Sequence, residues 1–262
     1  MDPADPRLDP YRHLRDADAR RSENGHGLFV AEGVTVIERL LQSSYAVRSV
    51  LLLPAKAAAL STALSTSGAE VLVAGRGVLA EVAGFDVHRG ALAVAVRPPP
   101  APLEAVVAGA RTVALLEGLT DHENLGAIVR SASALGVDAL VLDPTCADPL
   151  YRRCVRVSMG EILFMPWTRV ADWPGALALL QHARFELIAL TPAPDAPPLD
   201  EVVRGLGRRV ALLLGSEGPG LSAATLAVAD HMARIPLRAG VDSLNVGHAA
   251  AIAFHAVRRS PS

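Results

Sequence analysis

Lysine is nearly absent from this sequence: Lys56 is the only one, so 24 of the 25 basic residues are arginine. Aromatic residues make up 4% of the chain and hydrophobic residues 51%. The core must therefore consist mainly of alanine, valine and leucine. The formal net charge is −2, which argues against binding nucleic acid through bulk positive charge and leaves a local basic patch as the route to such binding.

Cysteine is scarce as well. Cys146 and Cys154 are eight residues apart, which is not the spacing of a metal site, and two free thiols suit a reducing compartment. The first residues lack the basic and apolar parts of a signal peptide, and no apolar run approaches the length of a membrane span. The sequence therefore predicts a cytoplasmic protein that binds no metal and no membrane.

Alternating strand and helix patterns predict two α/β domains. The segment 98–108 begins with consecutive prolines and is predicted to be a linker. Before it we expect a small domain over 25–97, and after it a larger domain over 109–262. The segment 1–24 is polar, and we interpret it as a solvated arm, with contact to phosphates as the alternative. In the first domain we expect strands at 28–33, 47–53, 71–73 and 91–96 and helices at 34–41, 55–64 and 77–82.

The second domain repeats this rhythm and predicts a parallel sheet of about six strands. Strands are expected at 112–116, 138–142, 163–167, 185–191, 210–214 and 232–236. Helices are expected at 125–135, 150–158, 173–183, 222–229 and 245–257. The last of these is apolar on nearly every face, which predicts a buried helix.

Polar residues and glycines lie at the predicted carboxyl ends of strands in this domain, where parallel sheets form their sites. They occupy 124–130, 215–220 and 242–245. The glycine order at 215–220 is not that of a dinucleotide-binding loop, and no lysine follows as in a phosphate-binding loop. A tight turn could explain these glycines but not Glu217 between them. Taken alone, Asn124 is typical of a helix N-cap and Arg130 of a surface ion pair.

Together these segments resemble the SpoU/TrmH branch of the SPOUT RNA methyltransferases. The resemblance covers 109–262 and runs through Asn124 to Arg130, then Leu214 to Leu221, then Ile235 to Leu237 followed by Ser243 to Val246. The first domain is similar, more loosely, to the small ribosomal-protein-like RNA-binding domain of many members, through 29–33 and 88–90.

The resemblance implies a fold with a trefoil knot, a homodimer, S-adenosylmethionine as cofactor and tRNA or rRNA as the partner. The reaction it implies is methylation of a ribose 2′-hydroxyl. It assigns the catalytic site to Arg130, Asn124, Glu217, Ser243 and Asn245. It assigns cofactor binding to Thr191, Gly215, Ile235 and Leu244.

Several roles stay open at this stage. Arg130 is either the proton acceptor or a group that holds a phosphate and orients the hydroxyl. His122 and His248 lie near the expected site, with a buried structural histidine as the alternative. Arg152, Arg153 and Arg156 form either part of an RNA surface or a solvated face. The rival functions are a non-catalytic RNA-binding or ribosome-assembly factor and, less favoured, a nucleotide-dependent enzyme.

Overall fold

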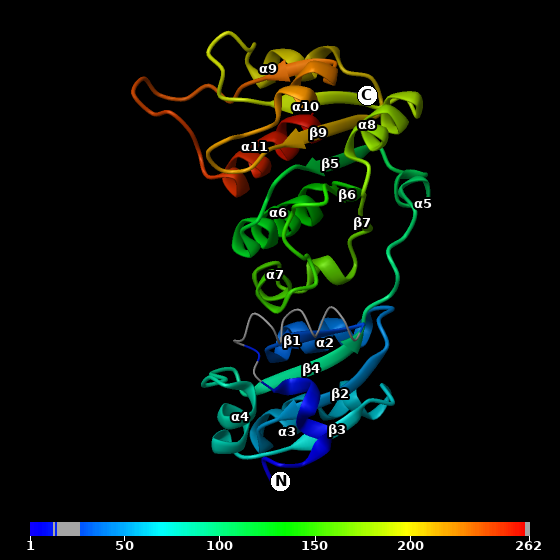
Figure 1. Ribbon diagram of the computed structural model, residues 1–262, viewed down its shortest axis with the longest axis vertical. Coiled ribbons are helices and arrows are strands. Elements are labelled where there is room, and N and C mark those ends of the chain that lie inside the picture. Colours follow the sequence, from blue (N-terminus) through cyan, green and yellow to red (C-terminus); the bar gives the residue numbers. More distant parts are fainter. Residues whose placement is uncertain (13, 15–26, 260–262) are drawn as a thin grey trace. The chain divides into compact units, whose positions relative to one another are not determined.

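The computed structural model describes residues 1–12, 14 and 27–259, which divide into two compact units (Figure 1). Unit 1 contains Met1–Pro99 and Leu150–Phe164, and unit 2 contains Pro100–Pro149 and Met165–Ser262. None of the helices in the described part of the chain is long and apolar enough to cross a membrane. Those same residues also contain no group of three or more His, Cys, Asp or Glu side chains that could hold a metal ion.

Unit 1 is built on a four-stranded sheet with the order β1-β4-β2-β3. β1 (Leu28–Glu32) and β2 (Val47–Leu52) both run antiparallel to β4 (Ala91–Val96), and β3 (Glu70–Val73) runs parallel to β2. The helices that connect these strands are α2 (Val34–Gln42), α3 (Pro54–Ser65) and α4 (Arg76–Ala83).

The beginning of the chain differs from the predicted solvated arm. The 3-10 helix η1 (Pro6–Tyr11) buries Leu8 and Tyr11, and Leu14 is buried as well. Leu8 and Tyr11 are three residues apart and so fall on one face of the 3-10 helix. The Tyr11 hydroxyl lies 2.8 Å from Ser49 Oγ, so the aromatic ring is anchored in the core. The part of the predicted arm at residue 13 and over 15–24 lies outside the described residues.

One segment from the second half of the sequence packs in unit 1. It contains α7 (Arg152–Val157) and the 3-10 helix η2 (Glu161–Leu163). Cys154, Val155 and Ile162 on this segment are buried. Arg152 Nη1 donates to Glu32 Oε2 over 2.7 Å. The expected single domain over 109–262 is therefore interrupted.

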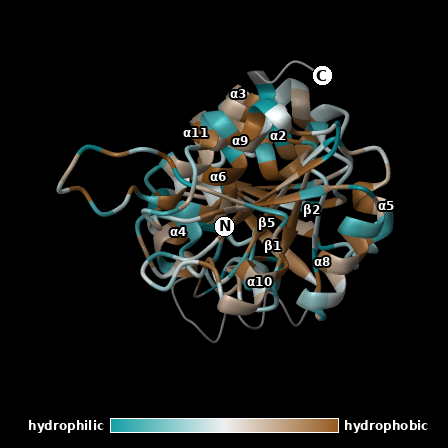
Figure 2. Cartoon of the chain, turned by 90° about the horizontal axis from the view of Figure 1, so that it is seen from above, coloured by the Kyte–Doolittle hydropathy of each residue, from teal (hydrophilic) through white to brown (hydrophobic). Residues whose placement is uncertain are grey.

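Unit 2 is built on a six-stranded parallel sheet with the order β10-β8-β9-β5-β6-β7. This confirms the predicted parallel α/β sheet. The strands are β5 (Thr112–Leu116), β6 (Ala139–Leu142), β7 (Trp167–Arg169), β8 (Glu186–Leu190), β9 (Val210–Leu214) and β10 (His231–Ala233). β5, β6 and β9 are buried almost throughout because helices cover both faces of such a sheet. Figure 2 shows strands such as β5 in the brown of hydrophobic residues.

The strand predicted at 163–167 is wrong in position. Its first residue ends η2, and β7 begins only at Trp167. Pro166 cannot donate a ladder hydrogen bond, although its carbonyl accepts from Leu140 N over 3.0 Å. The apolar run Ile162 to Met165 therefore has the pattern of a buried strand. In the structure, its residues up to Phe164 belong to unit 1 and Met165 belongs to unit 2.

The remaining helices of unit 2 include the predicted last helix, α11 (Val246–Arg259), which packs beside α6 (His122–Leu135). The others are α5 (Leu103–Val107), α8 (Trp173–His182), α9 (Leu199–Val202), the 3-10 helix η3 (Val203–Gly205) and α10 (Ala223–Val228). α11 buries Val246, Ala250, Ala253 and Phe254 but leaves Ile252 43% exposed. Within one chain this helix is thus half-buried, not buried all round as predicted.

Candidate functional site

Three neighbouring strands of unit 2 place most of the predicted cofactor residues at one edge. β10, β8 and β9 are adjacent and parallel, so their carboxyl ends meet. Thr191 follows β8, Gly215 follows β9 and Ile235 comes two residues after β10. Thr191 N donates to Ala233 O over 3.0 Å. The edge is where ligands bind in open parallel sheets.

Asn245 is the centre of a hydrogen-bond network at the start of α11. Its Nδ2 donates to Asn124 Oδ1 and to Glu217 Oε1, each over 2.8 Å. Its Oδ1 accepts from Gly247 N over 2.9 Å, which is the geometry of a helix N-cap. The nitrogen and the oxygen of the Asn245 amide therefore both have hydrogen-bond partners. The structure thus brings Asn124, Glu217 and Asn245 together, from segments far apart in the sequence.

The loop 215–221 folds tightly back on itself. Gly220 N donates to Ser216 O over 3.1 Å. A side chain at Gly215 would collide with the backbone of Gly220 and Leu221. Gly218 and Gly220 have φ angles of +90° and +72°, which favour glycine. Glycine is thus required here by the turn, and the turn presents Glu217 to Asn245.

The first predicted motif lies on α6. Asp121, not Asn124, is the N-cap of this helix: its carboxylate accepts from the backbone N–H groups of Glu123 and Asn124, each over 2.8 Å. The Asn124 side chain therefore does not cap α6, and its Oδ1 accepts from Asn245 instead. Arg130 is exposed, one helical turn beyond Ala127. Ala127 faces the α11 residue Gly247, whose lack of a side chain lets the two helices approach.

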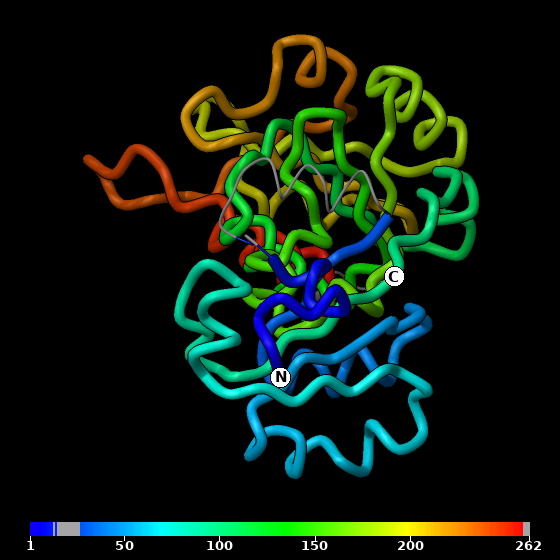
Figure 3. Tube along the Cα trace, turned by 60° about the horizontal axis from the view of Figure 1, so that its bottom comes forward, coloured from blue at the N-terminus to red at the C-terminus, as the bar shows by residue number. Residues whose placement is uncertain are grey.

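The segment 234–245 precedes α11 and carries two further predicted residues. Figures 1 and 3 show it as an orange-red loop that projects from unit 2. Ser243 and Leu244 are exposed on it, Leu244 by 37%. In the described residues neither Ser243 nor Arg130 makes a hydrogen bond to the Asn124–Glu217–Asn245 network. His248 is exposed, which contradicts the interpretation of a buried histidine.

Sequence reasoning missed the loop after β5. Glu117 and Gly118 follow this strand directly, the same signal that singled out the other loops. Glu117 Oε2 accepts from Ser222 N over 3.3 Å. Gly118 has φ of +69° and faces Ser216. The loop 117–118 therefore buttresses the loop 215–221.

The loop after β6 is held by hydrogen bonds from a single arginine side chain. Arg169 donates to the carbonyl oxygens of Asp143, Pro144, Cys146 and Ala147 over 2.7–3.2 Å. Burial by itself would raise the pKa of Asp143, but hydrogen bonds from Thr145, Cys146 and Gly118 lower it overall. Burial raises the pKa of the Cys146 thiol to about 12, so this cysteine stays a neutral packing residue. Arg152, Arg153 and Arg156 lie elsewhere, on α7 of unit 1.

Comparison with known proteins shows the family to which this chain is similar. The model of the SpoU rRNA Methylase family matches residues 111–255. An uncharacterized tRNA/rRNA methyltransferase of Mycobacterium tuberculosis is 48% identical over 261 residues, which cover 99% of this chain and 91% of the relative. The 23S rRNA (guanosine-2′-O-)-methyltransferase RlmB of Escherichia coli is 30% identical over 204 residues, covering 75% of this chain and 82% of that protein.

Solved structures agree in fold. The SpoU methyltransferase AviRb from Streptomyces viridochromogenes in complex with AdoMet has a TM-score of 0.82 at 24% identity, with 97% of this chain and 98% of that chain covered. An RNA 2′-O ribose methyltransferase has a TM-score of 0.76 at 27% identity, with 98% and 97% covered. The resemblance inferred from the ordered motifs is confirmed, and the network of Asn124, Glu217 and Asn245 lies within the matched residues 111–255. This chain belongs to the SpoU family of RNA methyltransferases.

Proposed function

We propose that this protein transfers a methyl group from S-adenosylmethionine to a ribose 2′-hydroxyl of tRNA or rRNA. The observation that carries the proposal is the Asn245 amide, held between Asn124 and Glu217 at the carboxyl edge of the sheet. The names of two relatives, one a 23S rRNA (guanosine-2′-O-)-methyltransferase and one an RNA 2′-O ribose methyltransferase, support the choice of the 2′-hydroxyl.

The sheet edge fits S-adenosylmethionine. The turn at Gly215 presents backbone rather than side chains, and Leu244 and Val241 offer exposed apolar surface to an adenine ring. Thr191, Gly215, Ile235 and Leu244 would hold the cofactor. When bound, it supplies an electrophilic methyl group on a sulfonium.

The side chains of this chain position the nucleophile. A ribose hydroxyl is weak while protonated, so orientation and proton removal are the tasks left to the protein. Asn124, Glu217 and Asn245 form a fixed surface for the ribose, and Ser243 extends it. A guanidinium stays protonated at neutral pH and binds phosphate through its planar fork. In this proposal Arg130 therefore holds a phosphate of the target nucleotide and orients the hydroxyl, and the carboxylate of Glu217, which lies in the network, accepts the proton that the hydroxyl loses as the methyl group is transferred.

The proposal includes a homodimer and a trefoil knot. The half-exposed face of α11, with Ile252, supports a dimer contact in unit 2. The return of the C-terminal segment to α6, beside the loop 215–221, supports the threading of the chain that makes a knot. A crystal structure of the full chain with S-adenosylmethionine tests both features.

Arg130→Ala and Arg130→Lys test the catalytic assignment. We expect Ala to slow single-turnover methylation of total rRNA and tRNA by about 100-fold or more, because the hydroxyl is no longer held in line with the methyl group. Cofactor affinity should be nearly unchanged, because Arg130 is not among the residues that hold the cofactor. Lys keeps the charge but loses the fork, so it should be nearly as slow.

Calorimetry with S-adenosylmethionine, NAD and ATP measures the binding affinity of the wild type and of both variants for each ligand. An Ala variant that methylates at the wild-type rate would remove Arg130 from the site. A wild-type protein that binds RNA and transfers no methyl group to any rRNA or tRNA would instead be a non-catalytic RNA-binding factor, and the proposed function would fail.

A further inference from the structure

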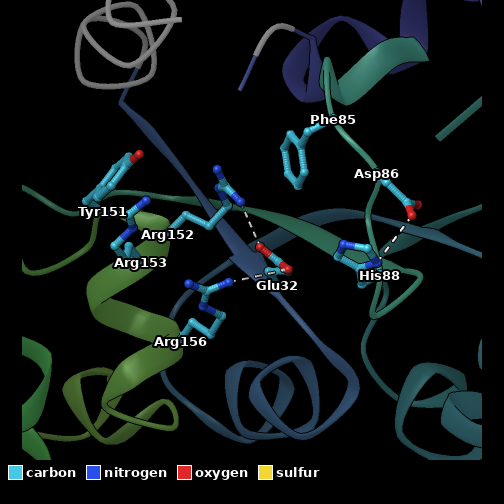
Figure 4. A pocket seen from close by; sticks show the side chains of 8 residues that line it. All are labelled: Glu32, Phe85, Asp86, His88, Tyr151, Arg152, Arg153 and Arg156. Carbon is cyan, nitrogen blue, oxygen red and sulfur yellow. Dashed lines mark hydrogen bonds and ion pairs between the residues drawn. The ribbon is translucent and has the colours of Figure 1, made fainter. Parts of the chain in front are cut away.

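The six-residue helices α7 and α10 are each held in place by a buried polar side chain. In unit 1, Arg152 of α7 donates to the carboxylate of Glu32, which is 5% exposed (Figure 4). In unit 2, the buried residue is Thr225 of α10 itself, which is 1% exposed. Helices this short are marginal by themselves, so tertiary contacts decide where they lie. The contacts of α10 bear on the candidate site, because α10 begins just after the loop 215–221.

The Thr225 hydroxyl joins α10 to its neighbours. Its Oγ1 accepts from Trp173 Nε1 over 3.0 Å and from Ser222 Oγ over 3.1 Å. Ser222 Oγ in turn accepts from Thr225 N over 3.2 Å, which caps α10. Ser222 N donates to Glu117 Oε2 over 3.3 Å. A chain of hydrogen bonds therefore runs from α8, which begins at Trp173, through α10 to the residue that follows β5.

Helix α8 holds α10 at a second point as well. Gln181 lies about two helical turns after Trp173 on α8. Its Nε2 donates over 3.0 Å to the carbonyl oxygen of Val228, the last residue of α10. Both ends of α10 are thus bonded to one longer helix. That helix is fixed in the core of unit 2 by its buried residues Ala176, Leu177 and Leu180.

The loop 215–221 depends on this arrangement at its second end. Its first end follows β9, which lies between β8 and β5 inside the sheet. At the second end, Leu221 is 8% exposed and packs in the same core cluster as Trp173. The backbone of Gly220 and Leu221 lies directly against Gly215. A shift of α10 would therefore be passed on to the turn at Gly215.

We propose that Thr225 and Trp173 are positioning residues for S-adenosylmethionine. Their hydrogen bond keeps α10, and with it the loop 215–221, in the form that accepts the cofactor. Neither residue is among those proposed to hold the cofactor. They act on the fraction of molecules whose loop is ready to bind, and the apparent affinity scales with that fraction. The inference rests on the proposed placement of the cofactor at Gly215.

Calorimetry of the full chain with S-adenosylmethionine tests the bond from both of its ends. Thr225→Val removes the hydroxyl, and Trp173→Phe removes the indole N–H but keeps an aromatic ring. Thr225→Ser is the conservative variant that keeps the hydroxyl. Thr168→Val is the matched control, because Thr168 is 2% exposed on the edge strand β7 and its Oγ1 donates to Ala101 O over 2.7 Å. Urea unfolding of each variant measures the stability that is lost.

We expect Thr225→Val and Trp173→Phe each to weaken S-adenosylmethionine binding about fivefold, which corresponds to one net hydrogen bond. The double variant should also lose about fivefold in total, because both changes remove the same bond. Thr225→Ser and Thr168→Val should stay within about twofold of wild type. A loss shared by Thr168→Val, or a loss below about twofold in Thr225→Val, would overturn the proposal.

The Trp173 indole proton gives a readout that lost stability alone would not move. The sequence contains two tryptophans, so Trp167→Phe identifies the Trp173 signal in a nitrogen-edited NMR spectrum. Because coupling between linked equilibria is reciprocal, the cofactor should strengthen the bond that favours its own binding. We expect S-adenosylmethionine to slow the exchange of this proton with solvent, in wild type and in Thr168→Val but not in Thr225→Val. An exchange rate that the cofactor leaves unchanged in wild type would also overturn the proposal.

Failure of this inference can be told apart from failure of the proposed function. Gly215→Ala reports on the placement of the cofactor, because it alters the turn itself. If Gly215→Ala weakens binding and Thr225→Val does not, the cofactor site stands and the positioning role is lost. If neither weakens binding, both are lost. A wild-type protein that shows the expected pattern of cofactor affinities but methylates no RNA would keep the positioning role and lose the reaction.

Discussion

Asn245 combines two tasks that single substitutions can separate. Its oxygen caps α11 and its nitrogen binds Asn124 and Glu217. Asn245→Asp keeps the cap, since aspartate caps helices as well as asparagine does. It also places a second carboxylate beside Glu217 and removes the donor.

We therefore expect Asn245→Asp to slow methylation at least tenfold, because the network that positions the ribose is lost. Asn245→Ala should add the loss of the cap, about 1 kcal/mol of unfolding free energy. Urea unfolding and single-turnover rates of both variants check this. If Asn245→Asp methylated as fast as wild type, the network would have no role in positioning the ribose.

Asp143 gives the fold a defined response to acid. Hydrogen bonds lower the pKa of Asp143 in the folded state. The contribution of Asp143 to the unfolding free energy is therefore complete above the pKa of the unfolded chain, about 3.9. It is lost as the pH falls through the lower folded value. We expect Asp143→Asn to reduce the unfolding free energy near neutral pH by about 1–3 kcal/mol. This difference should shrink toward acid. Urea unfolding from about pH 7 down to about pH 3 measures it, and a difference independent of pH would contradict this assignment.

At the scale of elements, the loop 215–221 is the most constrained part of the candidate site. Gly215→Ala would drive a methyl group into the backbone of Gly220 and Leu221, so the turn must open. We expect calorimetry to show at least tenfold weaker S-adenosylmethionine binding, together with a lower Tm. Gly205→Ala is the matched control, because open space surrounds Gly205. Unchanged cofactor affinity in Gly215→Ala would remove this turn from the cofactor site.

Most elements could be predicted because their apolar pattern is local. Strands 112–116 and 210–214 were predicted at their observed bounds, since a buried parallel strand reads as an uninterrupted apolar run. The burial of Leu8 and Tyr11 could not be predicted from polarity, because charged residues dominate this segment and the two apolar side chains show only the three-residue spacing of a 3-10 helix. The strand at 163–167 failed because an apolar run does not reveal which of two cores it enters.

At the scale of the whole molecule, the exposed face of α11 bears on assembly. Ile252 is 43% exposed, and we expect a glutamate there to break the proposed homodimer by burying an unpaired charge. Light scattering should give twice the 27.4 kDa of one chain for wild type and one chain for Ile252→Glu. Val228→Glu on α10 is the control, since Val228 is equally exposed. A dimer that survives Ile252→Glu would place the interface elsewhere.

Long-range pairings were beyond sequence reasoning. The resemblance to a known family predicted that Asn124, Glu217 and Asn245 belong to one site. Their spacing in the sequence does not by itself indicate that these segments meet. Nothing comparable linked Glu32 to Arg152. The two residues are 120 positions apart. An acidic residue before a glycine does not indicate a buried ion pair, and neither does an arginine on a helix.

This discontinuity of unit 1 has a consequence for synthesis. A ribosome adds about 5–20 residues per second, so the 120 residues that separate Glu32 from Arg152 take roughly 6–24 seconds to make. Until α7 emerges, the carboxylate of Glu32 has no guanidinium from that helix. Unit 1, although most of it is made first, therefore lacks α7 until β5, α6 and β6 have been translated.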